Sequence, residues 1–257
     1  MKAAGLEYLE RGEGEAVVFL HGIGGAAESF EGQLEGMGFG RRIAVNLPGY
    51  GASEAMDVMR FEAISARLSE FLKALEVSAA HLVGQSIGGM IALDHALRAP
   101  GEVKSLALIG TTPAFGGRDD SFKEAFLKAR LAPLEAGQSM EEMAKAAAPQ
   151  LVGPAADAAV MRRVAAPLAR VSEATWRSIL DCLVTFNRRE DLGRVEHRVC
   201  LIAGSHDQNA PARTMEKMAA KIEGSSFHLL EGAGHMINQE RVEETNQILD
   251  NFLRAKA

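Results

Sequence analysis

Short apolar runs recur along the chain and end close to glycine. The run A-V-V-F-L at residues 16–20 is bounded by Gly14 and by His21-Gly22, and it contains β-branched residues without polar alternation. Such a run is typical of a strand buried on both faces, as in a parallel sheet. Similar runs predict further strands at residues 42–46, 80–84, 103–110, 198–204 and 225–230.

Helical patterns lie between several of these runs. Residues 61–75 place apolar side chains three and four positions apart, and residues 87–98 follow directly from a predicted strand. Three- and four-residue spacing puts side chains on one face of a helix. Strands alternating with helices predict βαβ units with right-handed crossovers, and therefore an α/β fold with a mostly parallel central sheet flanked by helices.

The segment 114–189 breaks this alternation. It is rich in Ala, Met, Leu, Glu and Arg, with helical patterns but no clear strand. A helical insert between two late strands would lie above the carboxyl ends of the strands, where open α/β sheets bind ligands. We therefore expect residues 1–113 and 190–257 to form one core, and residues 114–189 to form a lid. Proline ends a helix shortly before itself, so four prolines are predicted to divide the lid into short helices: Pro133, Pro149, Pro154 and Pro167.

Composition and charge narrow the class of protein. Of the 257 residues, 47% are hydrophobic and 24% charged, as in ordinary folded proteins. The formal net charge is −6 and the basic residues are scattered, which argues against nucleic acid as a partner. Residues 1–15 carry several glutamates and no apolar run suited to a signal peptide or a membrane span. We expect a cytoplasmic protein without a membrane partner.

The cysteines and glycines give no indication of a cofactor. Cys182 and Cys200 stand in neither a C-x-x-C nor a zinc-ligand spacing, and are predicted to be buried apolar side chains. No G-x-G-x-x-G dinucleotide loop, phosphate loop or metal cluster occurs in the sequence. We therefore expect no metal and no cofactor.

The strongest local signal is G-Q-S-I-G at residues 84–88, a G-x-S-x-G between an apolar strand and an amphipathic helix. This is the setting of a nucleophile elbow, in which glycines leave room for a tight turn and the serine hydroxyl projects from it. The helix N-terminus favours negative charge developing near Ser86. Taken alone, the pentapeptide also fits a glycine-rich strand-to-helix turn with an incidental serine.

A serine hydroxyl needs a base, and the base needs an orienting acid. Asp207 follows the predicted strand 198–204, and His235 lies in the loop after the strand 225–230. The order Ser, Asp, His along the chain is that of α/β-hydrolases. The other histidines fit strands, a helix or loop-shaping positions better: His21, His81, His95, His197, His206 and His228. Among the carboxylates, Asp181, Asp191 and Glu231 fit the acid less well than Asp207.

With these blocks in place, nearly the whole chain outside the lid resembles the α/β-hydrolase superfamily. H-G-I-G-G at residues 21–25 resembles the family's oxyanion loop, and L-P-G-Y-G-A-S at residues 47–53 its L-P-G-x-G-x-S turn. The resemblance implies that the backbone N–H groups of Ile23 and Ile87 form an oxyanion hole. One departure is Asn46, where many relatives have Asp; it lies outside the triad. The closest likeness is to small lidded serine hydrolases, which include esterases, 3-oxoadipate enol-lactonases and meta-cleavage-product hydrolases.

The expected function is hydrolysis of a small carboxylic ester or lactone through an acyl-enzyme on Ser86. Trp176 is the candidate substrate contact in the lid, with packing of the lid on the core as the alternative. A second function with the same triad is carbon–carbon bond hydrolysis of a vinylogous diketone. An alternative of another class is a small-molecule receptor that hydrolyses its ligand slowly or never, and an acyltransferase is a further option.

Overall fold

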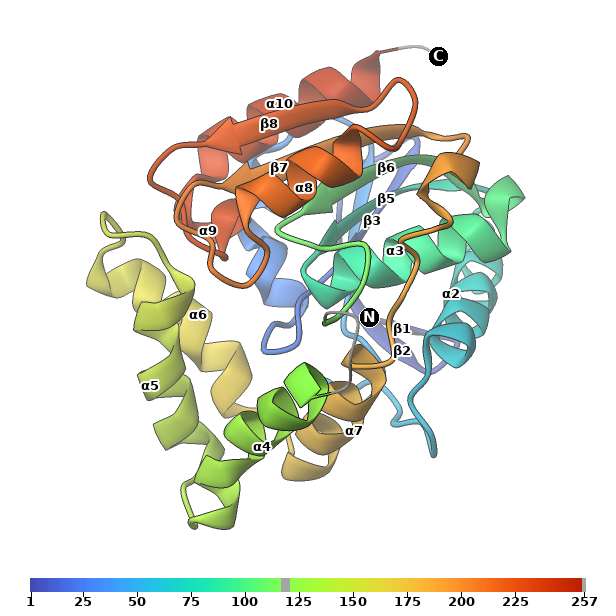
Figure 1. Cartoon of the computed structure of the whole chain (residues 1–257). Coiled ribbons are helices and arrows are strands. Elements are labelled where there is room, and N and C mark those ends of the chain that lie inside the picture. The colour runs from blue at the N-terminus through green and yellow to red at the C-terminus, as the bar shows by residue number, and fades with distance from the viewer. Residues whose placement is uncertain (117–120, 256–257) are drawn as a thin grey trace.

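The computed structural model, which describes residues 1–116 and 121–255, is built on an eight-stranded sheet in the order β1-β2-β4-β3-β5-β6-β7-β8 (Figure 1). From β4 through β3 to β8 all pairings are parallel, whereas β1 and β2 are antiparallel to their neighbours. The predicted, mostly parallel α/β sheet is confirmed. Its strands are β1 (Lys2–Ala3), β2 (Leu6–Arg11), β3 (Ala16–Leu20), β4 (Arg41–Val45), β5 (Ala80–Gln85), β6 (Val103–Ile109), β7 (Arg198–Gly204) and β8 (Ser226–Leu230).

The two N-terminal strands were not predicted. In β2, Leu6 and Tyr8 are buried in the larger core and alternate with the partly exposed Glu7 and Leu9, and the strand ends on two charged residues, Glu10 and Arg11. An antiparallel strand at the margin of a sheet carries this alternation instead of a continuous apolar run. Among the predicted strands, β4 begins and ends one residue earlier than expected, and the range of β7 agrees fully.

Alternate side chains of each central strand enter two separate cores. Val18 and Leu20 of β3 belong to the larger core, with residues of α2 (Phe61–Ala74), α3 (Ile87–Arg98) and α8 (Ala212–Ala219). Val17 and Phe19 belong to the smaller core on the opposite face, with residues of η1 (Ala27–Phe30), α1 (Glu31–Gly36), α9 (Ile237–Glu240) and α10 (Val242–Arg254). Because successive side chains of a strand point to opposite faces, burial on both sides explains the continuous apolar runs.

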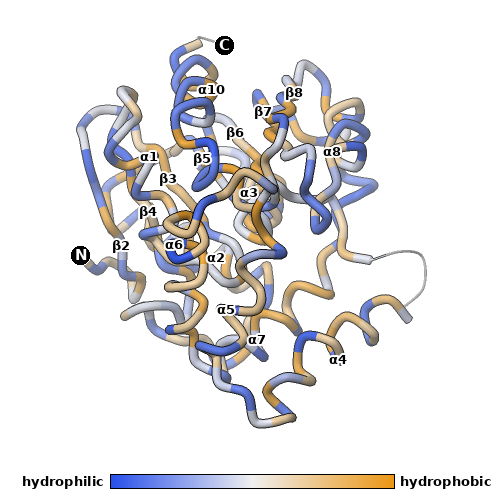
Figure 2. Tube along the Cα trace, turned by 90° about the vertical axis from the view of Figure 1, so that its left-hand side faces the viewer, coloured by the Kyte–Doolittle hydropathy of each residue, from blue (hydrophilic) through white to orange (hydrophobic). Residues whose placement is uncertain are grey.

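The hydropathy of the outer helices agrees with this layering. Figure 2 shows hydrophobic and hydrophilic segments alternating along α10, whose apolar side packs on the sheet. Leu249 and Leu253, four residues apart, supply that side. Within the described residues, no helix combines the length and the apolar character that crossing a membrane requires.

Between β6 and β7 the described chain is helical, with α4 (Ser121–Glu135), α5 (Met140–Leu151), α6 (Ala158–Ala169) and α7 (Glu173–Leu183). These helices lie together beyond one end of the sheet, at the bottom of Figure 1. Residues 117–120 of the segment 114–189 lie outside the described residues. Trp176, Ile179 and Leu180 anchor α7 in the larger core.

The prolines of this segment do not end helices in the predicted way. Pro133, Pro149 and Pro167 each lie inside a helix, and each of these helices continues for two residues beyond its proline. In the last turn the missing N–H costs a single hydrogen bond, and only a short piece of helix must follow. Pro154 lies between α5 and α6, as expected.

Candidate active site

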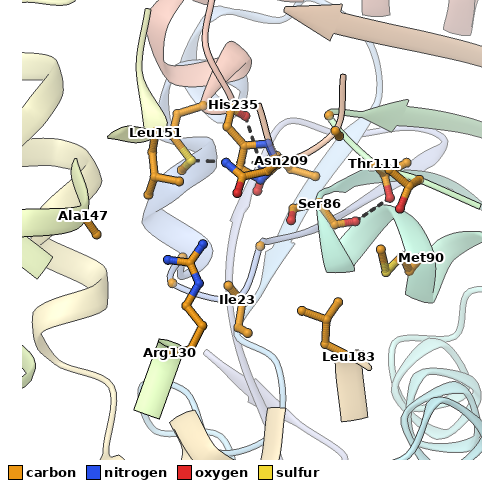
Figure 3. A pocket seen from close by; sticks show the side chains of 18 of the residues that line it. Ile23, Ser86, Met90, Thr111, Arg130, Ala147, Leu151, Leu183, Asn209 and His235 are labelled. Atoms are coloured by element: carbon orange, nitrogen blue, oxygen red, sulfur yellow. Dashed lines mark hydrogen bonds between the residues drawn. The ribbon is translucent and has the colours of Figure 1, made fainter. Parts of the chain in front are cut away.

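Ser86 occupies a strained turn between β5 and α3. Its φ of 56° and ψ of −122° lie in a region that non-glycine residues rarely adopt, at a cost on the order of 1–3 kcal/mol. The turn is held by a hydrogen bond from the Ser86 N–H to the carbonyl of Ile109, 2.9 Å long. On its other side the Thr111 hydroxyl donates to the Ser86 carbonyl over 2.7 Å (Figure 3). The end of β6 and the loop that follows it therefore fix the serine backbone.

Glycines at residues 84 and 88 make this turn possible. A Cβ on Gly88 would collide with the carbonyl oxygen of Leu20, and a Cβ on Gly84 would collide with the backbone of Gly88. Both collisions involve backbone atoms that belong to the central sheet or to the start of α3, so they cannot be relieved by a side-chain rotation. The glycines of G-x-S-x-G thus have the steric role that the sequence pattern predicted.

Asp207 and His235 meet at the carboxyl ends of β7 and β8. His235 Nδ1 lies 2.8 Å from Asp207 Oδ2, and both side chains are buried. The other carboxylate oxygen, Oδ1, accepts the N–H groups of Asn209 at 2.8 Å and Ala210 at 2.9 Å. Burial raises the pKa of Asp207, but the hydrogen bond and charge of His235 and the two backbone donors outweigh it, so the pKa lies below its usual value.

Ser86 and His235 line one cavity of about 260 Å³, together with Ile23 and Trp176. Figure 3 shows Ser86 and His235 on the walls of this cavity, with Ile23 beneath them. The backbone N–H groups of Ile23 and Ile87 have no hydrogen-bond acceptor within residues 1–116 and 121–255, and Ile87 begins α3, where such donors are unpaired in a helix. The structure thus brings the predicted triad, both predicted oxyanion donors and Trp176 to one region of the fold.

The loop that carries His235 is hydrogen bonded to the C-terminal end of α5 and to the residues that follow it. The carbonyl of Leu151 accepts the N–H groups of His235 at 2.7 Å and Met236 at 3.1 Å. The Glu240 carboxylate accepts the N–H of Gly153 at 2.6 Å and that of Gly234 at 3.0 Å. Because these hydrogen bonds join the helical segment directly to the loop, a displacement of the helical segment would also move the His235 imidazole.

The remaining candidates of the sequence have other surroundings. His81 and His95 are buried beside Ser105 and Ser65, and Asp191 forms ion pairs with Arg188 and Arg194. Within the part of the chain that the structure describes, no group of three or more His, Cys, Asp or Glu side chains is arranged to hold a metal ion.

His21 is a buried structural histidine whose hydrogen bonds require the neutral ring. Its Nε2 accepts the Leu47 N–H at 3.0 Å, so Nδ1 carries the proton and donates to the Gly22 carbonyl at 2.7 Å. Burial lowers the pKa of His21 from 6.5 to about 4. Protonation would place a second donor against the Leu47 N–H, which agrees with the direction of the shift.

This geometry predicts a loss of stability in acid. Between pH 6.5 and 4 the unfolded chain binds a proton at His21 that the folded chain does not, so acidification from pH 8 to pH 5 costs about 2 kcal/mol of unfolding free energy through this group. Urea unfolding at pH 8 and pH 5 gives the free energy of unfolding at each pH. Its decrease on acidification should be about 2 kcal/mol smaller for His21→Asn than for the wild type. His206→Asn, at an exposed position, should behave as the wild type. Equal losses in all three proteins would contradict the assignment.

Two features of the cavity were not predicted. Gln208 and Asn209 add polar groups to its wall, and Arg130 of α4 reaches it from the helical segment. Arg130 follows Phe122 and Phe126 at four-residue intervals, and all three line the cavity. That spacing is the signal that could have identified the arginine, because it places a cation in an aromatic stripe of one helix face.

A family model described as the alpha/beta hydrolase family matches residues 17–248. The dihydrolipoyllysine-residue acetyltransferase component of the acetoin cleaving system of Pseudomonas putida is 30% identical over 252 residues, which cover 94% of this chain and 64% of that protein. This chain therefore spans slightly less than two thirds of the length of that relative.

A second relative and a solved structure match over nearly their full lengths. The 2-hydroxy-6-oxo-2,4-heptadienoate hydrolase of Pseudomonas putida is 24% identical over 261 residues, covering 95% of this chain and 91% of that protein. The structure of a thermophilic esterase from Thermogutta terrifontis superposes with a TM-score of 0.88 at 22% identity, covering 97% of this chain and 93% of the esterase. At this identity the superposition establishes a common fold.

Proposed function

Because the chain belongs to the alpha/beta hydrolase family, we propose that it is a serine hydrolase that cleaves a small carboxylic ester or lactone through an acyl-enzyme on Ser86. One observation carries the proposal: Ser86, on its strained turn, lines the same cavity as His235, whose Nδ1 is hydrogen bonded to Asp207. A nucleophile, a base and an orienting acid in this relation are what acyl transfer requires.

In the first half of the reaction, His235 Nε2 takes the proton of the Ser86 hydroxyl while Oγ attacks the acyl carbonyl. Asp207 holds the proton on Nδ1 and stabilises the imidazolium that forms. The N–H groups of Ile23 and Ile87 bind the oxyanion, an interaction for which the loss of one donor typically costs about 10²- to 10³-fold in turnover. The bond to the leaving alcohol breaks, and the alcohol departs with the proton from His235.

In the second half, His235 removes a proton from water, which attacks the acyl-enzyme. The ester bond to Oγ then breaks, the acid is released, and His235 returns the proton to Ser86. We propose that residues 114–189 act as the lid over this reaction, with Trp176 contacting substrate. Support comes from the position of Trp176 in the cavity wall and from the hydrogen bonds that tie Leu151 and Gly153 to the His235 loop.

Relatives named as a 2-hydroxy-6-oxo-2,4-heptadienoate hydrolase and as an acetyltransferase component favour two alternatives with the same triad, carbon–carbon bond hydrolysis and acyl transfer. The carbon–carbon bond hydrolase would act on a vinylogous diketone, and the acyltransferase would pass the acyl group to an acceptor other than water. A receptor that turns over its ligand slowly or never is the alternative of another class.

The proposal is tested by steady-state hydrolysis of p-nitrophenyl esters of increasing acyl length by the wild type, with fluorophosphonate labelling of the nucleophile. Sustained turnover that is highest for short acyl groups, and stoichiometric labelling at Ser86, are expected. Adding methanol separates hydrolase from transferase, because a transferase would form the methyl ester in preference to the acid. Labelling without turnover would overturn the hydrolase in favour of the receptor.

A further inference from the structure

The cavity that holds Ser86 and His235 has a mostly apolar wall with a single permanent charge. Its wall is formed largely by apolar and aromatic side chains, among them Met90, Phe126, Leu168 and Leu183. Among the described residues that line it, only Arg130 is permanently charged, and Asp, Glu and Lys are absent. A fixed positive charge in apolar surroundings is costly unless an anion compensates it.

Arg130 has no such compensation within the protein. Within residues 1–116 and 121–255 its guanidinium forms no ion pair and donates no hydrogen bond. It lies over the ring of Phe126, with Cζ 5.2 Å from the ring centroid. Of the other arginines that the structure describes in segment 114–189, Arg170 pairs with Glu28 and Arg177 with Glu173. Those without an ion pair lie outside the cavity wall, namely Arg162, Arg163 and Arg189. Burial without a neighbouring acid also lowers the pKa of Arg130.

The position of Arg130 is fixed by its helix and by the neighbouring tryptophan. The Trp176 indole N–H lies 3.5 Å from the Arg130 carbonyl, so α7 holds this turn of α4. Figure 3 shows the guanidinium rising from α4 into the cavity, on the side of Leu151 and His235. A solvated arginine at the surface would extend away from the protein, whereas this one extends toward the reacting groups.

We propose that Arg130 binds a carboxylate of the substrate, so that the preferred substrates are small esters or lactones carrying a negative charge at the end remote from the scissile bond. The guanidinium presents paired N–H donors that match a carboxylate. The apolar wall between Arg130 and Ser86 suits a short hydrocarbon chain. The substrate class is therefore the monoester of a small dicarboxylic acid, or a small lactone that carries a free carboxylate. Hydrolysis with one water yields the dicarboxylate and an alcohol from the monoester, and a hydroxy dicarboxylate from the lactone. This inference rests on the proposed function.

The test compares kcat/KM for two matched series: monomethyl esters of linear dicarboxylic acids with four to eight carbons, and methyl esters of monocarboxylic acids of the same lengths. The wild type should prefer the charged series at one or two lengths. In Arg130→Gln the ratio of charged to neutral kcat/KM should fall about 30- to 100-fold, as expected for loss of a hydrogen-bonded ion pair, mainly through KM. Arg130→Lys should retain part of the ratio, since it keeps the charge without the paired donors.

Arg162→Gln is the matched control, because Arg162 is exposed on α6 and lies outside the cavity wall; its ratio should equal that of the wild type. Equal losses on both series in Arg130→Gln, or a wild type that prefers neutral esters, would overturn the carboxylate site and leave the hydrolase intact. Calorimetric titration with adipate separates the carboxylate site from the hydrolase proposal, because Ser86→Ala can bind this ligand without the reaction. Suppose that adipate binds and that Arg130→Gln abolishes the binding, while the wild type turns over neither ester series. That result would refute the hydrolase and retain the carboxylate site.

Discussion

Replacing Ser86 by alanine is expected to lower kcat for ester hydrolysis by about 10⁵- to 10⁶-fold, as for other serine hydrolases that lose their nucleophile. The hydroxyl is the group that forms the covalent bond in the proposed reaction, and no other hydroxyl takes its place in the strained turn between β5 and α3. Steady-state rates with p-nitrophenyl acetate give the loss. Mass spectrometry after rapid quenching should show an acetyl adduct in the wild type and none in Ser86→Ala.

A second variant at the same position separates chemistry from folding. Ser86→Gly also lacks the hydroxyl, but glycine adopts a φ of 56° without the cost that a side chain incurs. Ser86→Gly should therefore be as inactive as Ser86→Ala, but its free energy of unfolding should be about 1 kcal/mol larger than that of Ser86→Ala. Residual activity in either variant above one hundredth of the wild-type rate would contradict the nucleophile assignment.

The sequence predicts those parts of the fold in which burial leaves a simple pattern. β3, β5, β6 and β7 are covered on both faces, so their apolar runs are continuous and visible. β2 is less completely buried, and its charged residues interrupt the apolar run that would have identified it as a strand. The helices that contain Pro133 and Pro149 continue for two residues beyond the proline. Whether such a last turn forms depends on its packing against the rest of the protein, which the local sequence does not encode.

The residues of the site also differ in how far the sequence alone identifies them. Ser86 is identified by its own glycine neighbours, and Asp207 and His235 by their places after predicted strands. Leu151 and Glu240 accept hydrogen bonds from the His235 loop, and no local sequence pattern predicts these bonds. The spacing of Arg130 from Phe122 and Phe126 places it on an aromatic helix face, but its position in the cavity wall without an acidic partner is a property of the folded chain.

The second large effect is expected for Asp207→Asn, which should lower kcat by about 10⁴-fold at neutral pH. The reason lies in the two oxygens of this carboxylate. Oδ1 accepts the N–H groups of Asn209 and Ala210, so in the variant only the amide oxygen can occupy that place. The amide NH₂ must then face His235 Nδ1, where Oδ2 stood at 2.8 Å.

An NH₂ group donates, so Nδ1 has to accept and the ring proton moves to Nε2, the nitrogen that must be free to take the proton of Ser86. Imidazole ¹⁵N shifts should therefore report the Nδ1–H tautomer in the wild type and the Nε2–H tautomer in Asp207→Asn, alongside the loss of kcat. Asp191→Asn, which removes a carboxylate paired with Arg188 and Arg194 outside the cavity, should change neither. A fully active Asp207→Asn, or an inactive one that keeps the wild-type tautomer, would show that Asp207 does not orient the base through this hydrogen bond.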